Sequence, residues 1–241
     1  MGTRVSPRFR DWAGALGQVA HSGTLRRAQI SFAAMWAGES AFMVALGVVA
    51  FRDGGVAAVG AVTAARMAPA ALLAPFLATM ADRVRRERVL ACVGVFRAAT
   101  LACAAVMTAA GAPAAATYGF AVLATVAMTL FRPAHSALLP ALAKSPQELT
   151  SANAVRGMLD SLATLGGPVV AAVLLAASGP AAVFAACSAA SLLAGLVVVA
   201  LPYDAPPRAE TATGAGRAML QGFTTIAADG RLRLIAAHPP R

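Results

Sequence analysis

The sequence predicts an all-α membrane protein, a polytopic bundle of six transmembrane helices with both ends in the cytoplasm. Hydrophobic residues make up 59% of the 241 residues and charged residues only 12%, about half the charged share of a soluble domain. Six apolar stretches each have the roughly 20 residues that a helix needs to cross a bilayer. Most arginines lie between these stretches, which is the pattern that fixes the orientation of membrane helices.

The first 27 residues are predicted to be a cytoplasmic N-terminal segment. They carry five arginines and no sustained apolar core, so they do not resemble a cleavable signal peptide. We therefore expect the first span to act as the membrane-targeting signal and to stay in the protein.

The bundle is predicted to occupy residues 28–201. Its spans cover residues 28–51, 56–80, 89–110, 114–139, 151–177 and 181–201. Alanine and glycine are abundant in them, and such small residues let membrane helices approach closely. Four of the prolines lie inside the spans, which packed membrane helices tolerate.

Orientation follows from the distribution of Lys and Arg. With the N-terminus inside, 15 of these residues lie in inner segments and one, Arg52, lies in an outer turn. This asymmetry predicts a multi-pass protein of the plasma or inner membrane. Residues 202–241 are predicted to be cytoplasmic. They begin with a linker rich in Pro, Ala and Gly and continue as a truncated lead-in to a seventh span.

Several classes of function are disfavoured by the sequence. The positive charge is spread over the inner loops without interleaved aromatic residues, so we expect membrane lipid rather than nucleic acid as a partner. The three cysteines show no Cys-x-x-Cys spacing. Nucleophile-elbow, zinc-protease and phosphate-binding-loop motifs are missing from the sequence. We therefore expect no enzyme activity, no metal and no cofactor.

The predicted inner loop between the second and third spans carries the most informative motif. An acid is followed by clustered arginines, in the order Asp82-Arg83-Val84-Arg85-Arg86. Such a loop can gate the inner side by pairing with other helices, and it can hold phospholipid headgroups. It resembles the signature loop of the major facilitator superfamily, Gly-x-x-x-Asp-Arg-x-x-Arg-Arg, with matches at Asp82, Arg83 and Arg86. Ala78 and Glu87 depart from that pattern.

Later stretches are similar to the enterobactin-exporter-like branch of that superfamily. Residues 133–140 read Pro-Ala-His-Ser-Ala-Leu-Leu-Pro, and an Ala-Asn-Ala helix start follows at 152–154. The resemblance implies two inverted three-helix repeats, equal to the N-terminal half of a twelve-span transporter. It also implies gradient-driven transport of small molecules, often export.

Six charged residues lie inside the predicted spans, where charge is expensive and usually faces a cavity or a partner. Glu39, in the first span, is the candidate for proton or cation coupling, and the alternative is a structural ion pair. Arg66 and Arg97 are expected to line a cavity or to pair with Glu39.

The fifth span begins with a polar stripe that includes Arg156 and Asp160. Their spacing of four predicts an ion pair within the helix, and contact with substrate or with the inner gate is the alternative. Arg132 is expected near the inner surface, with a lipid or loop role.

The sequence thus predicts a secondary-active exporter, represented by its N-terminal half. The alternative is a non-transporting scaffold or an inactive remnant, because alternating access needs two bundles. A second half-transporter or a self-dimer would supply the missing wall. Four arginines against two acids inside the spans favour an anionic or amphipathic small-molecule substrate.

Overall fold

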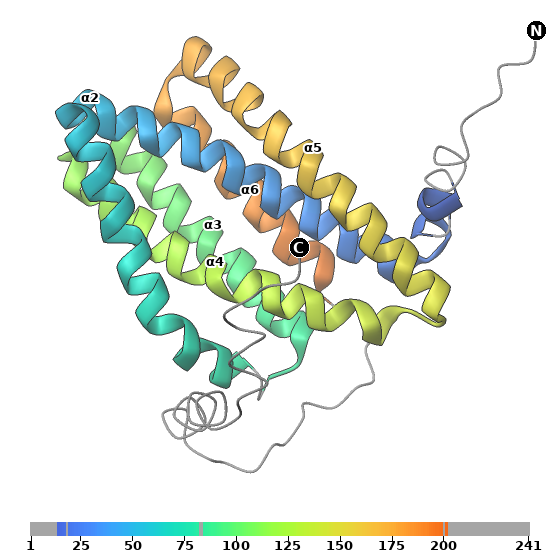
Figure 1. The fold of residues 1–241 in the computed structure, drawn as a ribbon. Helices are drawn as coiled ribbons and strands as arrows, with labels where there is room; N and C mark the ends of the chain where they lie inside the picture. Colours follow the sequence, from blue (N-terminus) through green and yellow to red (C-terminus); the bar gives the residue numbers. More distant parts are fainter. Residues whose placement is uncertain (1–13, 18, 82–83, 200, 202–241) are drawn as a thin grey trace, which may run out of the picture.

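The structure, a computed structural model, describes residues 14–17, 19–81, 84–199 and 201. Five helices account for most of this part of the chain, and all are long and apolar enough to cross a membrane. They are α2 (Gly23–Ala81), α3 (Arg86–Ala109), α4 (Ala114–Leu142), α5 (Pro146–Ser178) and α6 (Pro180–Val198). They lie side by side as one elongated bundle (Figure 1), so the all-helical membrane architecture is confirmed.

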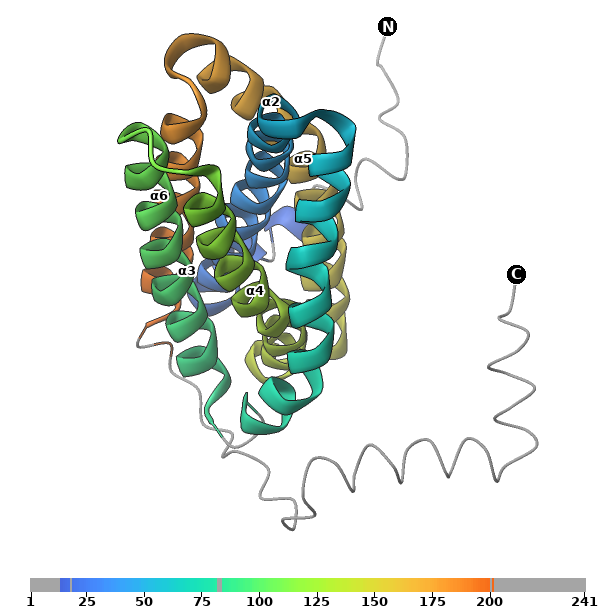
Figure 2. The same cartoon turned by 90° about the vertical axis from the view of Figure 1, so that its left-hand side faces the viewer.

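Helix α2 is bent sharply at a pair of glycines. Gly54 and Gly55 have non-helical backbone angles, and Gly55 has a φ of 65°, a region that glycine enters without steric cost. The chain reverses direction there, as Figures 1 and 2 both show. We call residues 23–53 the first arm and residues 56–81 the second arm. The predicted spans 28–51 and 56–80 fall one on each arm.

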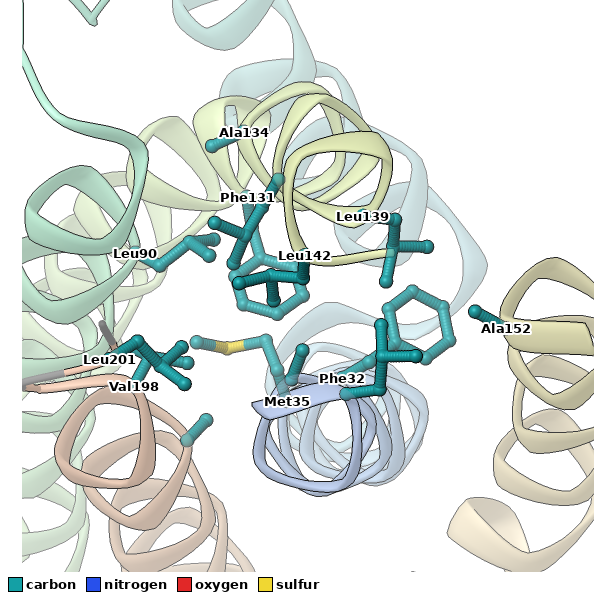
Figure 3. Packing of buried hydrophobic residues seen from close by; sticks show 14 of the residues in the cluster. Phe32, Met35, Leu90, Phe131, Ala134, Leu139, Leu142, Ala152, Val198 and Leu201 are labelled. Atoms are coloured by element: carbon teal, nitrogen blue, oxygen red, sulfur yellow. The ribbon is translucent and has the colours of Figure 1, made fainter. Parts of the chain in front are cut away.

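The first arm of α2 lies at the centre of the bundle. Helix α2 packs against α4, α5 and α6, and α3 packs against α4 and α6, whereas α4 and α5 share few contacts. Figure 3 shows Phe32 and Met35 of the first arm among buried side chains of the surrounding helices. This arrangement gives the first arm contact with most of the other helices.

Glycines allow two close helix crossings. A Cβ atom on Gly94 of α3 would lie 2.6 Å from the Cα of Gly195 on α6, and one on Gly167 of α5 would lie 3.0 Å from the Ala37 carbonyl oxygen. Real Cβ atoms essentially never come as close as the first of these distances, and the second is tighter than most real contacts. Backbone therefore contacts backbone at the α3–α6 crossing, the kind of packing by which helices associate in lipid.

Polar side chains define two helix ends. Ser145 accepts a hydrogen bond from the Glu148 amide at 3.2 Å, and Glu148 Oε2 accepts one from the Lys144 amide at 2.6 Å. These two bonds cap the N-terminus of α5, which starts five residues before the predicted span 151–177. At the end of α6, Arg27 donates to the carbonyls of Val197 and Val199.

The other predicted boundaries differ by a few residues from the observed ones. Spans 89–110, 114–139 and 181–201 correspond to α3, α4 and α6. Residues 1–13 and 202–241, and with them the predicted linker and the lead-in to a seventh span, lie outside the described residues.

Candidate functional site

Glu39 forms ion pairs with two arginines from other helical segments. Arg97 of α3 donates from Nη2 to Glu39 Oε2, and Arg66 Nη1 of the second arm lies 3.9 Å from Glu39 Oε1. The side chains of Arg97, Arg66 and Glu39 are 0%, 2% and 15% exposed. We call these three residues the buried charge cluster. Of the two expectations for Arg66 and Arg97, the pairing with Glu39 is confirmed, and the lining of a cavity stays a prediction.

Further contacts hold the two guanidinium groups of the buried charge cluster. Arg97 donates from Nη1 to the Ala124 carbonyl at 3.2 Å, and Arg66 lies 3.5 Å from the Thr125 hydroxyl. Both guanidinium groups lie over the Phe42 ring, at 5.3 and 5.9 Å from its centroid, which is a cation–π geometry. The cluster therefore joins both arms of α2 to α3 and α4.

The charge balance of this cluster depends on Glu39. Two buried arginines and one carboxylate leave one net positive charge when Glu39 is ionised. Removal of one partner from a buried ion pair is costly because it leaves a charge without compensation. Loss of the Glu39 charge would therefore weaken the connection among three helical segments at once.

A second group of charged side chains bridges α4 and α5. Arg132 Nη2 donates to Asp160 Oδ1 at 2.9 Å, and Arg156 Nη1 donates to the Ser136 hydroxyl at 2.7 Å. Arg132 and Asp160 are 51% and 38% exposed. We call Arg132, Asp160 and Arg156 the open charge cluster.

The open charge cluster corrects one expectation. The intrahelical pair of Arg156 with Asp160 does not form, because Asp160 faces Arg132 on α4 and Arg156 reaches Ser136 on that helix. Arg132 also bonds to a neighbouring helix, and the lipid or loop role expected for it stays a prediction. Spacing along one helix could not show these partners.

Two stacked aromatic rings lie beneath the arginines of the open charge cluster. Phe32 and Trp36, one helical turn apart on the first arm, have ring centroids 6.0 Å apart and an interplanar angle of 10°. The Arg132 guanidinium lies 4.3 Å from the Trp36 centroid, and that of Arg156 lies 5.0 Å from the Phe32 centroid. We call Phe32 and Trp36 the aromatic shelf. Sequence reasoning missed the shelf, although its spacing of four was visible.

His135 lies next to the shelf and is fully buried. Its ring centroid is 5.0 Å from that of Phe32, and its Nε2 lies 3.1 Å from the Ala28 carbonyl oxygen. The contact joins α4 to the first arm, so His135 helps to fix the position of the shelf.

The predicted inner-loop motif is only partly described. Asp82 and Arg83 lie outside the described residues, and Arg86 is the first residue of α3, with Nη1 3.4 Å from the Ala81 carbonyl oxygen. Glu87, in the first turn of α3, pairs with Arg85 at 2.5 Å. The gating role of the motif stays a prediction. Among the described residues, no three or more His, Cys, Asp or Glu form a group that could hold a metal ion.

Comparison with known proteins gives one result for this chain. The sequence profile of the Major Facilitator Superfamily matches residues 30–238, a range that includes both charge clusters and the aromatic shelf. No curated protein and no solved structure matches the chain.

Proposed function

We propose that this chain, which belongs to the Major Facilitator Superfamily, forms one six-span half of a gradient-driven exporter of small molecules in the cell membrane. The observation that carries the proposal is the buried charge cluster, in which one carboxylate joins arginines from two other helical segments. A membrane-embedded acid with such partners is expected at a solute or proton pathway.

Six spans are supported by the length of the two arms of α2. At 1.5 Å per residue the first arm is about 46 Å long and the second about 39 Å. Each exceeds the roughly 30 Å hydrocarbon core. With α3 to α6 they would make six crossings, grouped as two inverted three-helix repeats, and the arginine distribution supports a cytoplasmic position for both ends.

Glu39 is the proposed coupling group. It is the only acid in the buried charge cluster, so its protonation would change the net charge there from one to two positive charges. The extra charge would favour separation of the segments that Glu39 joins. Proton binding would thereby be linked to the helix arrangement, which is what coupling of transport to a gradient requires.

A second bundle would complete the pathway. Alternating access in this superfamily rests on two bundles that move about a shared site. A second half-transporter or a second copy of this chain would supply the other wall. The proposed substrate is an anionic or amphipathic small molecule, since arginines exceed acids in both charge clusters.

Transport by the purified chain in lipid vesicles tests this proposal. The probe is radiolabelled p-aminohippurate, an aromatic monocarboxylate, and its uptake is followed with and without an imposed pH gradient. We expect the gradient to accelerate uptake, and Glu39→Gln to remove that acceleration. Arg52→Gln, a change at an exposed residue next to the bend of α2, is the matched control that should keep it.

Two results would contradict the proposal. Unchanged gradient dependence in the Glu39→Gln protein would exclude Glu39 as the coupling group. Uptake no faster than in protein-free vesicles, for a chain that is inserted and folded, would exclude transport by this chain alone.

A further inference from the structure

The open charge cluster occupies an unusual place between two helices. Helices α4 and α5 share few contacts, yet two hydrogen bonds between polar side chains join them, Arg132 to Asp160 and Arg156 to Ser136. The connection between α4 and α5 therefore depends on hydrogen bonds in which another polar group could replace one of the partners.

The depth of these charges indicates that they face water. Arg132 lies ten residues before the end of α4 and Asp160 fourteen residues after the start of α5, which are distances of about 15 and 21 Å along the helices. Both side chains are exposed in the bundle. Charges at such a depth avoid lipid and face a water-filled cavity or a partner. The exposed side of the cluster is therefore the side that a dissolved ligand can reach.

The aromatic shelf holds both guanidinium groups in place. Arg132 lies over Trp36 and Arg156 over Phe32, and the two rings are stacked. Each guanidinium has five N–H donors. In the described part of the chain, Arg132 and Arg156 each use one nitrogen in a hydrogen bond. Oriented donors that remain free are suited to a planar carboxylate, which an arginine can bind through two parallel hydrogen bonds.

We infer that Arg132 and Arg156 form a binding site for the carboxylate of an amphipathic small molecule, in which the ligand replaces Asp160 as the partner of Arg132. This inference rests on the proposed function for the identity of the pathway, but binding can be measured without transport. The cluster carries one net positive charge, so a single negative charge neutralises it. The apolar part of the ligand would contact Trp36, which is half-buried, whereas Phe32 is fully buried.

Replacement of Asp160 has a structural consequence. The ion pair between α4 and α5 would be lost as the ligand bound, so the ligand would take over the connection between the helices. Trp36 lies one helical turn from Glu39 on the first arm. The aromatic shelf beneath the binding site and the proposed coupling group would thus share one helical segment.

Quenching of Trp36 fluorescence tests the inference. The chain has two tryptophans, so a Trp12→Phe background leaves Trp36 alone. The purified chain in detergent is titrated with 6-bromohexanoate, whose bromine quenches tryptophan at short range, and with uncharged 6-bromohexanol. We expect saturable quenching by the carboxylate and only linear, unsaturated quenching by the alcohol.

Variants identify the residues that bind. Arg132→Gln should weaken 6-bromohexanoate binding at least about tenfold, and Arg132→Lys should restore only part of it because lysine lacks the planar fork. Asp160→Asn should tighten binding several-fold, since the competing carboxylate is gone. Arg52→Gln removes one positive charge elsewhere and should leave the dissociation constant unchanged.

Each outcome decides for or against the site. Quenching that saturates equally in the parent, Arg132→Gln and Asp160→Asn proteins would overturn the inference, and so would tighter binding of the alcohol. A circular dichroism melt of each variant shows that it is folded. Binding with the expected variant pattern but without transport in vesicles would overturn the proposed function alone. Gradient-driven transport without that pattern would overturn only this site.

Discussion

The two charge clusters both contact the first arm of α2, but they differ in burial and in the place of the acid. In the buried charge cluster the carboxylate of Glu39 lies between two enclosed arginines. In the open charge cluster, Asp160 pairs with an exposed arginine that is supported by an aromatic ring. The enclosed acid holds helices together and is the proposed coupling group, whereas the open pair is the proposed site of exchange with a ligand.

Removal of Glu39 should give the largest effect on stability. Glu39→Ala leaves two enclosed arginines without a counter-charge, and breaking a buried pair in this way costs about 3–5 kcal/mol. We expect a large fall in the Tm of the detergent-solubilised protein, measured by scanning fluorimetry. The double variant Glu39→Met with Arg97→Met should recover part of the loss, and a Tm equal to that of the parent in the single variant would show that the cluster contributes little.

Substitution of Arg97 should destabilise less than removal of Glu39. Arg97→Gln leaves Glu39 with Arg66, which lies 3.9 Å away, so the remaining charges still compensate each other. We expect Arg97→Gln to lower the free energy of unfolding by on the order of 2 kcal/mol, which is less than for Glu39→Ala, and to lower the Tm less in the same thermal measurement. A larger fall than for Glu39→Ala would mean that packing of Arg97 on Phe42, rather than charge, dominates at this position.

Removal of Asp160 should change stability only slightly. Exposed ion pairs contribute about 0–1 kcal/mol, so Asp160→Asn should leave the Tm close to that of the parent while it tightens 6-bromohexanoate binding. The contrast with Glu39→Ala separates an exchangeable pair from an enclosed one. A Tm loss as large as that of Glu39→Ala would show that the two clusters are alike.

Added salt should give the smallest of these effects, and it compares the two charge clusters by a single change of conditions. At 1 M ionic strength charges on exposed groups are screened within about 3 Å. Added NaCl should therefore weaken 6-bromohexanoate binding at the open charge cluster. The Tm difference between the parent and Glu39→Ala proteins should change little, because the buried charge cluster is shielded from ions. If added NaCl changed the 6-bromohexanoate affinity and this Tm difference to the same extent, the two clusters would not differ in their exposure to ions.

Much of the fold could be predicted from the sequence because lipid imposes a length and a polarity on each helix. The apolar stretches gave the helices to within a few residues, and the cost of a lone charge in a membrane predicted partners for Glu39. The predicted turn between the spans that end at residue 51 and begin at residue 56 contains Gly54 and Gly55, where α2 bends in the structure.

The open charge cluster could not be predicted in the same way. Arg156 and Asp160 have the spacing of an intrahelical pair, but a spacing says nothing about a closer partner on another helix. The pairing of Asp160 with Arg132 and the position of the aromatic shelf depend on how α4 and α5 lie on the first arm. The gating motif at Asp82 and Arg83 lies outside the described residues and stays a prediction.

The close crossing of Gly94 and Gly195 has a mechanical consequence for the bundle. With backbone against backbone, α3 and α6 have no long side chains at the crossing that could change rotamer to absorb sliding or rotation. We therefore expect these two helices to move together as a stiff frame. Helix α5 packs closely on α2, with a second close crossing at Gly167, and touches α4 and α6 only lightly. We therefore expect α5 to stay with α2, and displacement during any conformational cycle to concentrate where α5 meets α4 and α6.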